Sequence, residues 1–432
     1  MKLDRKTFLR SLGAGALGLL ATGRGWGARE GDLTELTAAP VWSDDDPEGF
    51  WRQVRAAFPM TPQRSYFNTG GLGPAPQCVL DMLTVASRQL QERVETGHDF
   101  FAQARVIVAG YFGARPDDLC FTRNCTEGNC IVATGLELAA ADEVIFESHA
   151  HPGGSFPWLN RQRTDGIIVK TFEPDPLRAE GNVERIAALI TPRTRVIQVS
   201  HITSPTGIIM PVPAIAKLAQ QHRLWFHVDG AQSAGMIPVD LPALGCDSFA
   251  TSGHKWIGGP HETGVLWVRG DKISQVTPRQ VGAYSSEDID LHNPSAFLYT
   301  KGTHRFEYGT RNAASVLALA EAARFQNAIG RDRIAARGHA LADRVRAGFE
   351  KIDGVEILTP ADPALCGSIL TFRSPKMAYG KIFEHLLADH QLRCRPVSEV
   401  GLDAVRVSTH LFNSVEECDH LIAALGEVLK KV

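Results

Sequence analysis

Short apolar runs recur between residues 119 and 269, and they are rich in β-branched and aromatic side chains. In chain order they read LCFT, EVIFES, IIVKTF, RVIQVS, LWFHVD, SFATS and GVLWVR. Runs of this kind are typical of strands that are buried on both faces. Helix-like stretches, such as GNCIVATGLEL and PAIAKLAQQH, lie between several of them. This alternation predicts an α/β fold with a mostly parallel central sheet flanked by helices on both faces.

A helical period precedes this region. In QCVLDMLTVASRQLQERV, which follows a proline, Val79, Leu83, Ala86 and Leu90 fall on one helical face. The sequence HDFFAQARVIVAGYFG predicts a second helix shortly after it. We expect both helices to belong to the same domain as the central sheet.

The last part of the chain predicts a smaller α+β domain, which we assign to residues 311–432. An irregular FEYGTRN segment leads into a long connecting helix, AASVLALAEAARFQNAIG, and then into strand-like SILTFR and VRVS. The final helix is expected to begin at Ser414, because Glu417 completes a capping box. The large domain is then residues 36–310, and we expect its segment 36–75 to pack on the small domain.

The first 35 residues have the layout of an export signal. Basic residues in MKLDRKTFLR precede a weakly apolar Ala/Gly/Leu segment, which is the order of the regions in such signals. The stretch DRKTFLR resembles a twin-arginine signal with Arg-Lys in place of Arg-Arg. A short amphipathic helix or a disordered tail is the alternative. We therefore leave residues 1–35 out of the fold argument and expect a periplasmic or secreted protein, or otherwise a cytoplasmic one.

Composition and charge exclude several classes of protein. The formal net charge is -3, so nothing favours binding to nucleic acid or to an anionic membrane. No apolar stretch approaches the ~20 residues that span a bilayer, and we expect a soluble protein. Eight cysteines in 432 residues do not make a disulfide framework. The spacing of Cys120, Cys125 and Cys130 is not a usual zinc signature, and burial is their expected role.

The polar residues just after the apolar runs are the first candidates for chemistry, because open parallel sheets bind ligands beyond the carboxyl ends of their strands. LWFHVD ends in Asp229, a carboxylate that needs a cation or a hydrogen-bond donor if it is buried. The protonated pyridine nitrogen of pyridoxal phosphate (PLP) is one such cation. Gln232, one turn later, could contact another polar atom of the same ring. Taken alone, an Asp at a strand end is more often a helix cap.

The segment SFATSGHKWIGGP carries the second candidate, Lys255. Lysine amines form Schiff bases with PLP, and burial tunes them readily. Ser252 and His254 beside it offer a hydroxyl and an imidazole that suit a phosphate. A single lysine is usually a solvated charge. Lys255 becomes a candidate for the cofactor's amine only when it is taken together with Asp229.

Two more segments follow predicted strands. In RNCTEGN, the backbone N–H groups of Cys125 and Thr126 at a helix start, with the Thr126 hydroxyl, would make an anion site, and simple capping by Thr126 is the alternative. In EVIFESHAHPGG, one of His149 and His151 could stack on a flat ring or transfer a proton. We expect no metal site there, because the H-x-H pair lacks a recognisable third ligand.

Together these segments resemble the class V aminotransferase family of PLP-dependent fold-type I enzymes, which includes cysteine desulfurases and isopenicillin N epimerase-like enzymes. The resemblance runs from about residue 60 to the end, and the block that ends in TSGHKWIGGP is its most specific part. It implies PLP fold type I, with PLP as the cofactor. It assigns the phosphate of the cofactor to Cys125, Thr126, Ser252 and His254, with Thr310 contributed by a neighbouring subunit. The residues that it assigns to the rest of the cofactor are His151 (ring stacking), His201 (near the ring), Asp229 (pyridine nitrogen), Gln232 (ring hydroxyl) and Lys255 (Schiff base).

The same resemblance implies a substrate contact and a partner. DAVRVSTHLFNS looks like the family's R-x-S segment, whose arginine binds the substrate carboxylate, and this nominates Arg406. A guanidinium suits a bidentate grip on a carboxylate. Asn68 in YFNTGG is a weaker candidate near the substrate. Lys255 and His151 are the catalytic candidates, and the role of Thr310 implies a homodimer.

The resemblance implies an aminotransferase-, epimerase- or lyase-type reaction on an α-amino acid or a peptide-like amine, through the Schiff base of Lys255. An exported enzyme of this kind resembles those that modify secreted peptides such as siderophores. The first alternative is a cysteine desulfurase or C–S lyase, for which Cys394, flanked by two arginines in QLRCRPVSEV, is the candidate nucleophile. The second alternative is a catalytically silent protein that binds PLP or a peptide.

Overall fold

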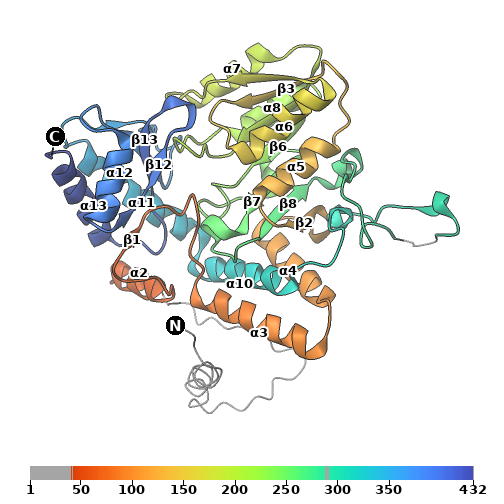
Figure 1. Cartoon of the computed structure of the whole chain (residues 1–432), viewed down its shortest axis with the longest axis horizontal. Helices are drawn as coiled ribbons and strands as arrows, with labels where there is room; N and C mark the ends of the chain where they lie inside the picture. Colours follow the sequence, from red (N-terminus) through yellow and green to blue (C-terminus); the bar gives the residue numbers. More distant parts are fainter. Residues whose placement is uncertain (1–39, 41, 288–290, 432) are drawn as a thin grey trace, which may run out of the picture. The chain divides into compact units, whose positions relative to one another are not determined.

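The computed structural model describes residues 40, 42–287 and 291–431 (Figure 1). The expected export signal at residues 1–35 lies outside the described residues. Within the described part of the chain, no helix combines the length and the apolar character needed to cross a bilayer.

A seven-stranded sheet forms the centre of the larger part of the chain (Figure 1), in the order β2-β8-β7-β6-β5-β3-β4. Neighbouring strands from β7 to β4 are parallel, whereas β8 is antiparallel to both β7 and β2. The predicted mostly parallel sheet is thus confirmed, and each predicted run is a strand. The strands are β2 (Leu119–Thr122), β3 (Glu143–Glu147), β4 (Ile168–Phe172), β5 (Thr194–Ser200), β6 (Trp225–Asp229), β7 (Ser248–Ser252) and β8 (Gly264–Val268).

Helices alternate with these strands, and α4, α5, α6, α7 and α8 contact them directly. Their bounds are α3 (Gln77–Arg93), α4 (His98–Tyr111), α5 (Cys125–Gly135), α6 (Pro152–Asp165), α7 (Ala179–Leu189), α8 (Val212–Gln221) and α9 (Leu241–Leu244). The buried face of α3 differs from the predicted one, because Met82 joins Val79 and Ala86 in the core while Leu83 and Leu90 are only half-buried. The reason is that α3 packs mainly on one neighbour, α10 (Ala313–Ile329).

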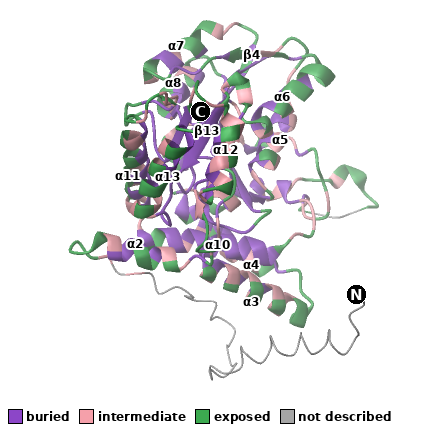
Figure 2. Ribbon diagram, turned by 60° about the vertical axis from the view of Figure 1, so that its left-hand side comes forward, coloured by how far each residue is buried: buried purple, intermediate pink, exposed green. Residues whose placement is uncertain are grey.

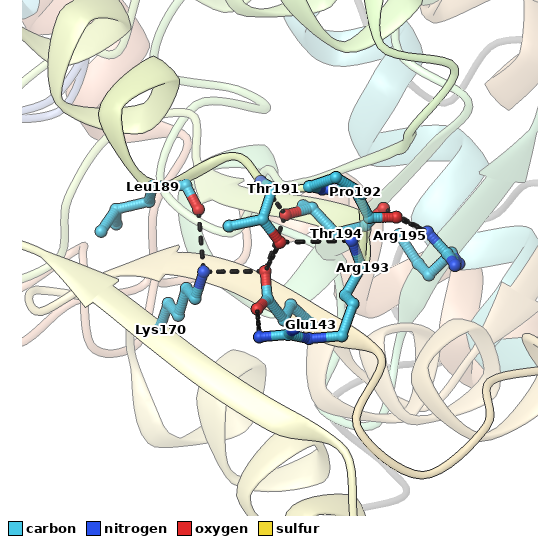
Figure 3. Close-up of polar contacts among 8 residues, drawn as sticks. All are labelled: Glu143, Lys170, Leu189, Thr191, Pro192, Arg193, Thr194 and Arg195. Carbon is cyan, nitrogen blue, oxygen red and sulfur yellow. Dashed lines mark hydrogen bonds and ion pairs between the residues drawn. The ribbon is translucent and has the colours of Figure 1, made fainter.

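A buried carboxylate ties the amino ends of β3 and β5 to the middle of β4 (Figure 3). Glu143, the first residue of β3, has no exposed surface. Its carboxylate accepts hydrogen bonds from Lys170 Nζ at 2.7 Å, Thr191 Oγ1 at 2.6 Å and Arg193 Nη2 at 3.0 Å. Burial raises the pKa of Glu143, but hydrogen bonds from Lys170, Thr191 and Thr194 outweigh burial and bring the pKa down to about 2. The charge is therefore satisfied, and it fixes the end of the sheet opposite the carboxyl ends of the strands.

The C-terminal part contains a four-stranded antiparallel sheet in the order β12-β13-β10-β9. Ser414 caps the last helix, and Ser414 and Glu417 each accept the other's backbone N–H, so the predicted capping box is confirmed. The elements are β9 (Glu356–Ile357), β10 (Ile369–Arg373), β12 (Arg395–Val397), β13 (Ala404–Ser408), α11 (Arg331–Phe349), α12 (Tyr379–Ala388) and α13 (Val415–Val428).

The segment of residues 42–75 contacts this C-terminal part. Its short strand β1 (Ser65–Tyr66) pairs in parallel with β11 (Leu392–Arg393), and its helix α2 (Pro47–Ala56) shares an apolar cluster with Phe325 of α10 and Phe412. The long helix α10 is almost entirely buried (Figure 2). The predicted domain boundary at residue 310 stays a prediction, placed just before this helix.

Candidate active site

A cavity of about 280 Å³ lies at the carboxyl ends of β6 and β7, next to the start of α5. It brings together eight of the residues that the sequence nominated, and it also contains the glycine-rich turn after β1. Its lining residues are Gly70, Gly71, Asn124, Cys125, Thr126, His151, Gly153, Ser204, Asp229, Ala231, Ser252, His254, Lys255, Arg395 and Arg406.

Asp229, the last residue of β6, is 6% exposed. Its Oδ1 accepts the Ala231 N–H at 3.0 Å and lies 3.2 Å from the Cys125 thiol, while its Oδ2 accepts from Asn129 Nδ2 at 2.8 Å. Each of these donors is neutral. A buried carboxylate without a cation in hydrogen-bond contact is suited to a cationic ligand group.

A chain of hydrogen bonds below Asp229 has a defined direction. The Asn129 amide nitrogen donates to Asp229, so its oxygen faces His227 Nε2 at 2.8 Å. That oxygen can only accept, which puts the proton of a neutral His227 on Nε2. Burial lowers the pKa of His227 to about 4, so the ring is neutral at pH 7. His227 Nδ1 then accepts from the Ser248 hydroxyl at 2.8 Å, which itself accepts from Trp225 Nε1 at 3.0 Å.

In this chain of hydrogen bonds, each group donates to the next one in the direction of the Asp229 carboxylate. Its members lie on β6, β7 and α5, which are rigid elements of the core. Such a chain stabilises a negative charge on Asp229 without placing a counter-ion in the cavity. Sequence reasoning missed His227, Ser248 and Asn129. The run LWFHVD did contain a signal, because a histidine inside a buried apolar strand requires hydrogen-bond partners.

Lys255 lies in a single π-helical turn, Gly253–Ile257, directly after β7, and its own backbone is non-helical. Among the described residues, no hydrogen bond or ion pair engages its amine. Burial lowers the pKa of Lys255, and the Asp229 charge opposes that effect without reversing it. The neutral form of the amine, which is the nucleophile, is therefore more accessible than that of an exposed lysine.

The glycine-rich turn packs against this lysine. The Gly73 N–H donates to the His254 carbonyl at 2.8 Å. A Cβ on residue 73 would lie 1.8 Å from the Lys255 carbonyl oxygen, so only glycine fits there. The turn of YFNTGGLGP therefore fixes the backbone from which the Lys255 side chain extends.

The start of α5 faces the other end of the cavity. Asn124, not Thr126, caps this helix, since its side chain accepts the Glu127 N–H at 2.9 Å. This corrects the alternative in which Thr126 is the cap, and it leaves the Thr126 hydroxyl at the cavity. The Cys125 N–H donates to Ser252 Oγ at 3.0 Å, which joins the helix start to the end of β7. A helix N-terminus with two nearby hydroxyls forms an anion site.

The histidines divide between three environments. His151 lines the cavity and caps α6, where its Nδ1 accepts the Gly153 N–H at 3.0 Å, so its proton lies on Nε2. Burial and then the Lys255 charge lower the pKa of His151. His149 instead contacts Glu173 at 3.1 Å and Thr206 Oγ1 at 2.9 Å. His201 is buried outside the cavity lining.

His254 completes the set beside the anion site. It lines the cavity, its Nδ1 has no hydrogen-bond partner among the described residues, and burial lowers its pKa to about 4. A buried ring nitrogen without a partner is an expected position for a ligand atom.

Arg406 lies in the middle of β13 and has no exposed surface. Its guanidinium donates to the Ser204 carbonyl at 2.9 Å, to Ser204 Oγ at 3.0 Å and to Asn68 Oδ1 at 3.1 Å. Within the described part of the chain it forms no ion pair, and its Nε has no partner. Burial, followed by the charge of Arg395, lowers the pKa of Arg406 to about 9, so it remains a cation at pH 7. A buried cation with neutral partners is suited to an anionic ligand.

Four nominated residues lie outside the cavity lining: Asn68, which contacts Arg406, the buried His201, Gln232 and Thr310. The Gln232 amide is fully engaged, since it accepts from Trp256 Nε1 at 2.8 Å and donates to the Gly70 carbonyl at 2.9 Å. Thr310 is exposed and lines a different pocket, with Tyr284 and Glu307. The roles that the sequence assigned to Gln232 and Thr310 stay predictions.

The site fits PLP by the chemistry of its residues. A buried carboxylate with only neutral donors can hold a pyridinium, an unpaired amine on the partly buried Lys255 can bond an aldehyde carbon, and a helix start with two hydroxyls can hold a phosphate. The residues for these three parts are Asp229, Lys255 and the group of Thr126, Ser252 and His254. Within the described residues, no cluster of side chains is suited to a metal ion.

Comparison with known proteins agrees with this fit. The family described as Aminotransferase class-V matches residues 75–421. The isopenicillin N epimerase of Amycolatopsis lactamdurans is 32% identical over 400 residues, which cover 88% of this chain and 99% of that protein. A probable cysteine desulfurase of Methanothermobacter thermautotrophicus is 29% identical over 405 residues, covering 88% and 97%.

Two solved structures share the fold at 26% identity. The apo cysteine desulfurase from Thermococcus onnurineus NA1 gives a TM-score of 0.80, with 88% of this chain and 98% of that chain covered. The cystine C–S lyase C-DES, in complex with its product cysteine persulfide, gives 0.79, with 86% and 99% covered. The fold and the site thus define a PLP-dependent enzyme of fold type I. The chain belongs to the class-V aminotransferase family.

Proposed function

We propose that this enzyme acts on the amine of an α-amino acid or a peptide-like substrate and moves the proton at Cα, as in epimerisation or transamination. One observation carries the proposal: the Lys255 amine, the Asp229 carboxylate and the buried Arg406 guanidinium line the same cavity. Arg406 supplies the cation for a substrate carboxylate, and Lys255 supplies a base next to it.

When PLP is bound, it withdraws electrons from Cα and makes the Cα proton acidic. Asp229 would hold the protonated pyridine nitrogen, and its chain of neutral donors keeps the carboxylate in place. Arg406 orients the substrate through its carboxylate, so that Cα lies near Lys255. The Lys255 Nζ, whose pKa burial lowers, accepts the Cα proton and returns it. A base on one face returns the proton to that face, so epimerisation would require a proton donor on the opposite face, and transamination would require delivery of the proton away from Cα.

The experiment begins with the visible absorbance band that PLP acquires on bonding to a lysine amine. We expect this band in the wild type and its loss in Lys255→Ala, with the Lys272→Ala variant as a matched control. A panel of single-enantiomer amino acids is then incubated in deuterated water, and deuterium at Cα, inversion and keto acid are measured. Absence of the band would refute the cofactor role, and absence of Cα exchange with every substrate would refute the proposed reaction.

Cysteine desulfuration or C–S lysis is the second candidate, because several relatives are named as probable cysteine desulfurases. The nominated nucleophile Cys394 does not favour the desulfurase form. It is fully buried in the apolar core of the C-terminal part, and burial raises its pKa to about 12 despite the charge of Arg393. C–S lysis needs no such thiol. Release of sulfide or persulfide from cysteine or cystine, faster than Cα exchange with other amino acids, would reverse the order of the two candidates.

The location of the enzyme is also a proposal. The basic and weakly apolar start of the chain supports export in a folded, PLP-loaded form, and hence the modification of a secreted peptide in the periplasm. The test is fractionation of cells that express the full chain and a variant with Arg5 and Lys6 replaced by Gln. Export predicts periplasmic wild type and cytoplasmic variant. Wild-type protein confined to the cytoplasm would refute the proposal.

A further inference from the structure

A second arginine faces the cavity beside Arg406. Arg395 on β12 and Arg406 on β13 are direct partners in an antiparallel strand pair, and both line the cavity. Like charges opposite each other on neighbouring strands destabilise a sheet. The pair therefore carries a cost that the fold itself does not require, and an anion near both guanidinium groups would offset it.

The carboxylates near Arg395 and Arg406 do not neutralise both guanidinium groups, so the pair is suited to more than one anion. Arg395 forms an ion pair with Glu399, which is partly exposed, but its Nη1 is buried and has no partner among the described residues. Arg406 has neutral partners and an unpartnered Nε. The remaining carboxylate at the cavity, Asp229, is engaged by its own donors and suits the cofactor.

The positive charge of Arg395 acts on Lys255 and His151, the catalytic candidates, and on Arg406. Burial is the largest cause of the lowered pKa values of Lys255, His151 and Arg406, and the Arg395 charge lowers each of them further. The guanidinium thus faces the same space as the proposed base and the proposed carboxylate site. It is not a surface charge that happens to be near the rim.

We propose that Arg395 is a specificity-determining residue that binds a second carboxylate of the substrate, so that the enzyme selects acidic α-amino acids or peptides with an acidic side chain. This inference rests on the proposed function, in which Arg406 binds the α-carboxylate. Arg395 binds the side-chain carboxylate through its free Nη1, and Glu399 holds the arginine in position.

The test uses ligands without an amine, so that binding is measured without turnover. Succinate and glutarate, with propionate and butyrate as monocarboxylate counterparts, are titrated calorimetrically into PLP-loaded wild type, Arg395→Gln and Arg395→Lys. Arg393→Gln is the matched control, because the guanidinium of Arg393 stacks over Phe383 at 5.0 Å and does not line the cavity. Thermal unfolding verifies that each variant is folded.

We expect the wild type to prefer dicarboxylates, and Arg395→Gln to weaken dicarboxylate binding by about 10- to 100-fold while monocarboxylate binding changes less than about threefold. Arg395→Lys keeps the charge and should lose less, and Arg393→Gln should match the wild type. Equal weakening of both ligand classes would mean that both arginines hold one carboxylate and would overturn the inference, as would a wild type without preference. Failure of the proposed function would be seen separately, as loss of the PLP band or of Cα exchange.

Discussion

The burial of Cys394 gives a quantitative prediction about its reactivity. Only the thiolate attacks an electrophile. With a pKa of about 12, about one Cys394 in ten thousand is a thiolate at pH 8, whereas about one in four would be at the ordinary pKa of about 8.5. The side chain has no exposed surface, which adds the cost of opening the core. We therefore expect alkylation of Cys394 in the folded protein to be at least about 1,000-fold slower than in the unfolded chain.

The assay is iodoacetamide labelling at pH 8, with and without urea, followed by peptide mass spectrometry at Cys394. The companion variant is Cys394→Ala, which should reduce the free energy of unfolding by about 1–2 kcal/mol through the small cavity that it leaves. It should leave Cα exchange, and any sulfide release, unchanged. Rapid labelling of the folded protein would refute this reasoning, because it would show a thiol that reaches solvent. Sulfide release that disappears in Cys394→Ala would do the same and would restore the desulfurase interpretation.

Three further predictions address the site and its surroundings. Arg406→Lys keeps a cation but loses the fork that holds a carboxylate, so kcat/KM should fall about 100-fold while the PLP band remains. The carboxyl of Glu147 is buried, and this raises its pKa to about 7 from 4.5 in the unfolded chain, so the folded state loses stability as the pH rises through this range. The free energy of unfolding, measured with urea, should therefore favour Glu147→Gln over the wild type by about 3 kcal/mol more at pH 8 than at pH 4. A difference between variant and wild type that is the same at both pH values would contradict this. Asn129→Ala removes a donor to Asp229 and should lower the free energy of unfolding at pH 7 by about 1–3 kcal/mol, and unchanged urea midpoints would show that the chain of hydrogen bonds contributes little.

Much of the fold and the core of the site follow from local patterns. The apolar runs were all strands, because a strand buried on both faces must be apolar throughout, and this is visible without any knowledge of its neighbours. Asp229 and Lys255 were recognisable for a related reason. Asp229 ends one such run and Lys255 lies three residues after another, and parallel strands bring their carboxyl ends to one edge of the sheet.

What local patterns did not reveal depends on strand register and on contacts between distant segments. Cys394 and Arg395 are neighbours in QLRCRPV, and the sequence nominated Cys394 as a nucleophile while it gave Arg395 no role of its own. Pairing with β13 decides between them: it places Arg395 opposite Arg406 at the cavity, while Cys394 enters the apolar core. Adjacent side chains of an extended segment point in opposite directions, and only the register says which direction is the cavity.

The sequence by itself therefore determined the class of fold and the cofactor, and it nominated two residues, Asp229 and Lys255, that the structure brings to one cavity. The tertiary structure decided which arginines line the cavity, that Cys394 is buried in the apolar core, and that His227 and Asn129 form a chain of hydrogen bonds to Asp229. The physical reason is the separation along the chain of the residues on which each property depends. Periodicity and strand ends are properties of a few consecutive residues, whereas burial, charge pairing and hydrogen-bond direction arise between residues that only the folded chain brings together.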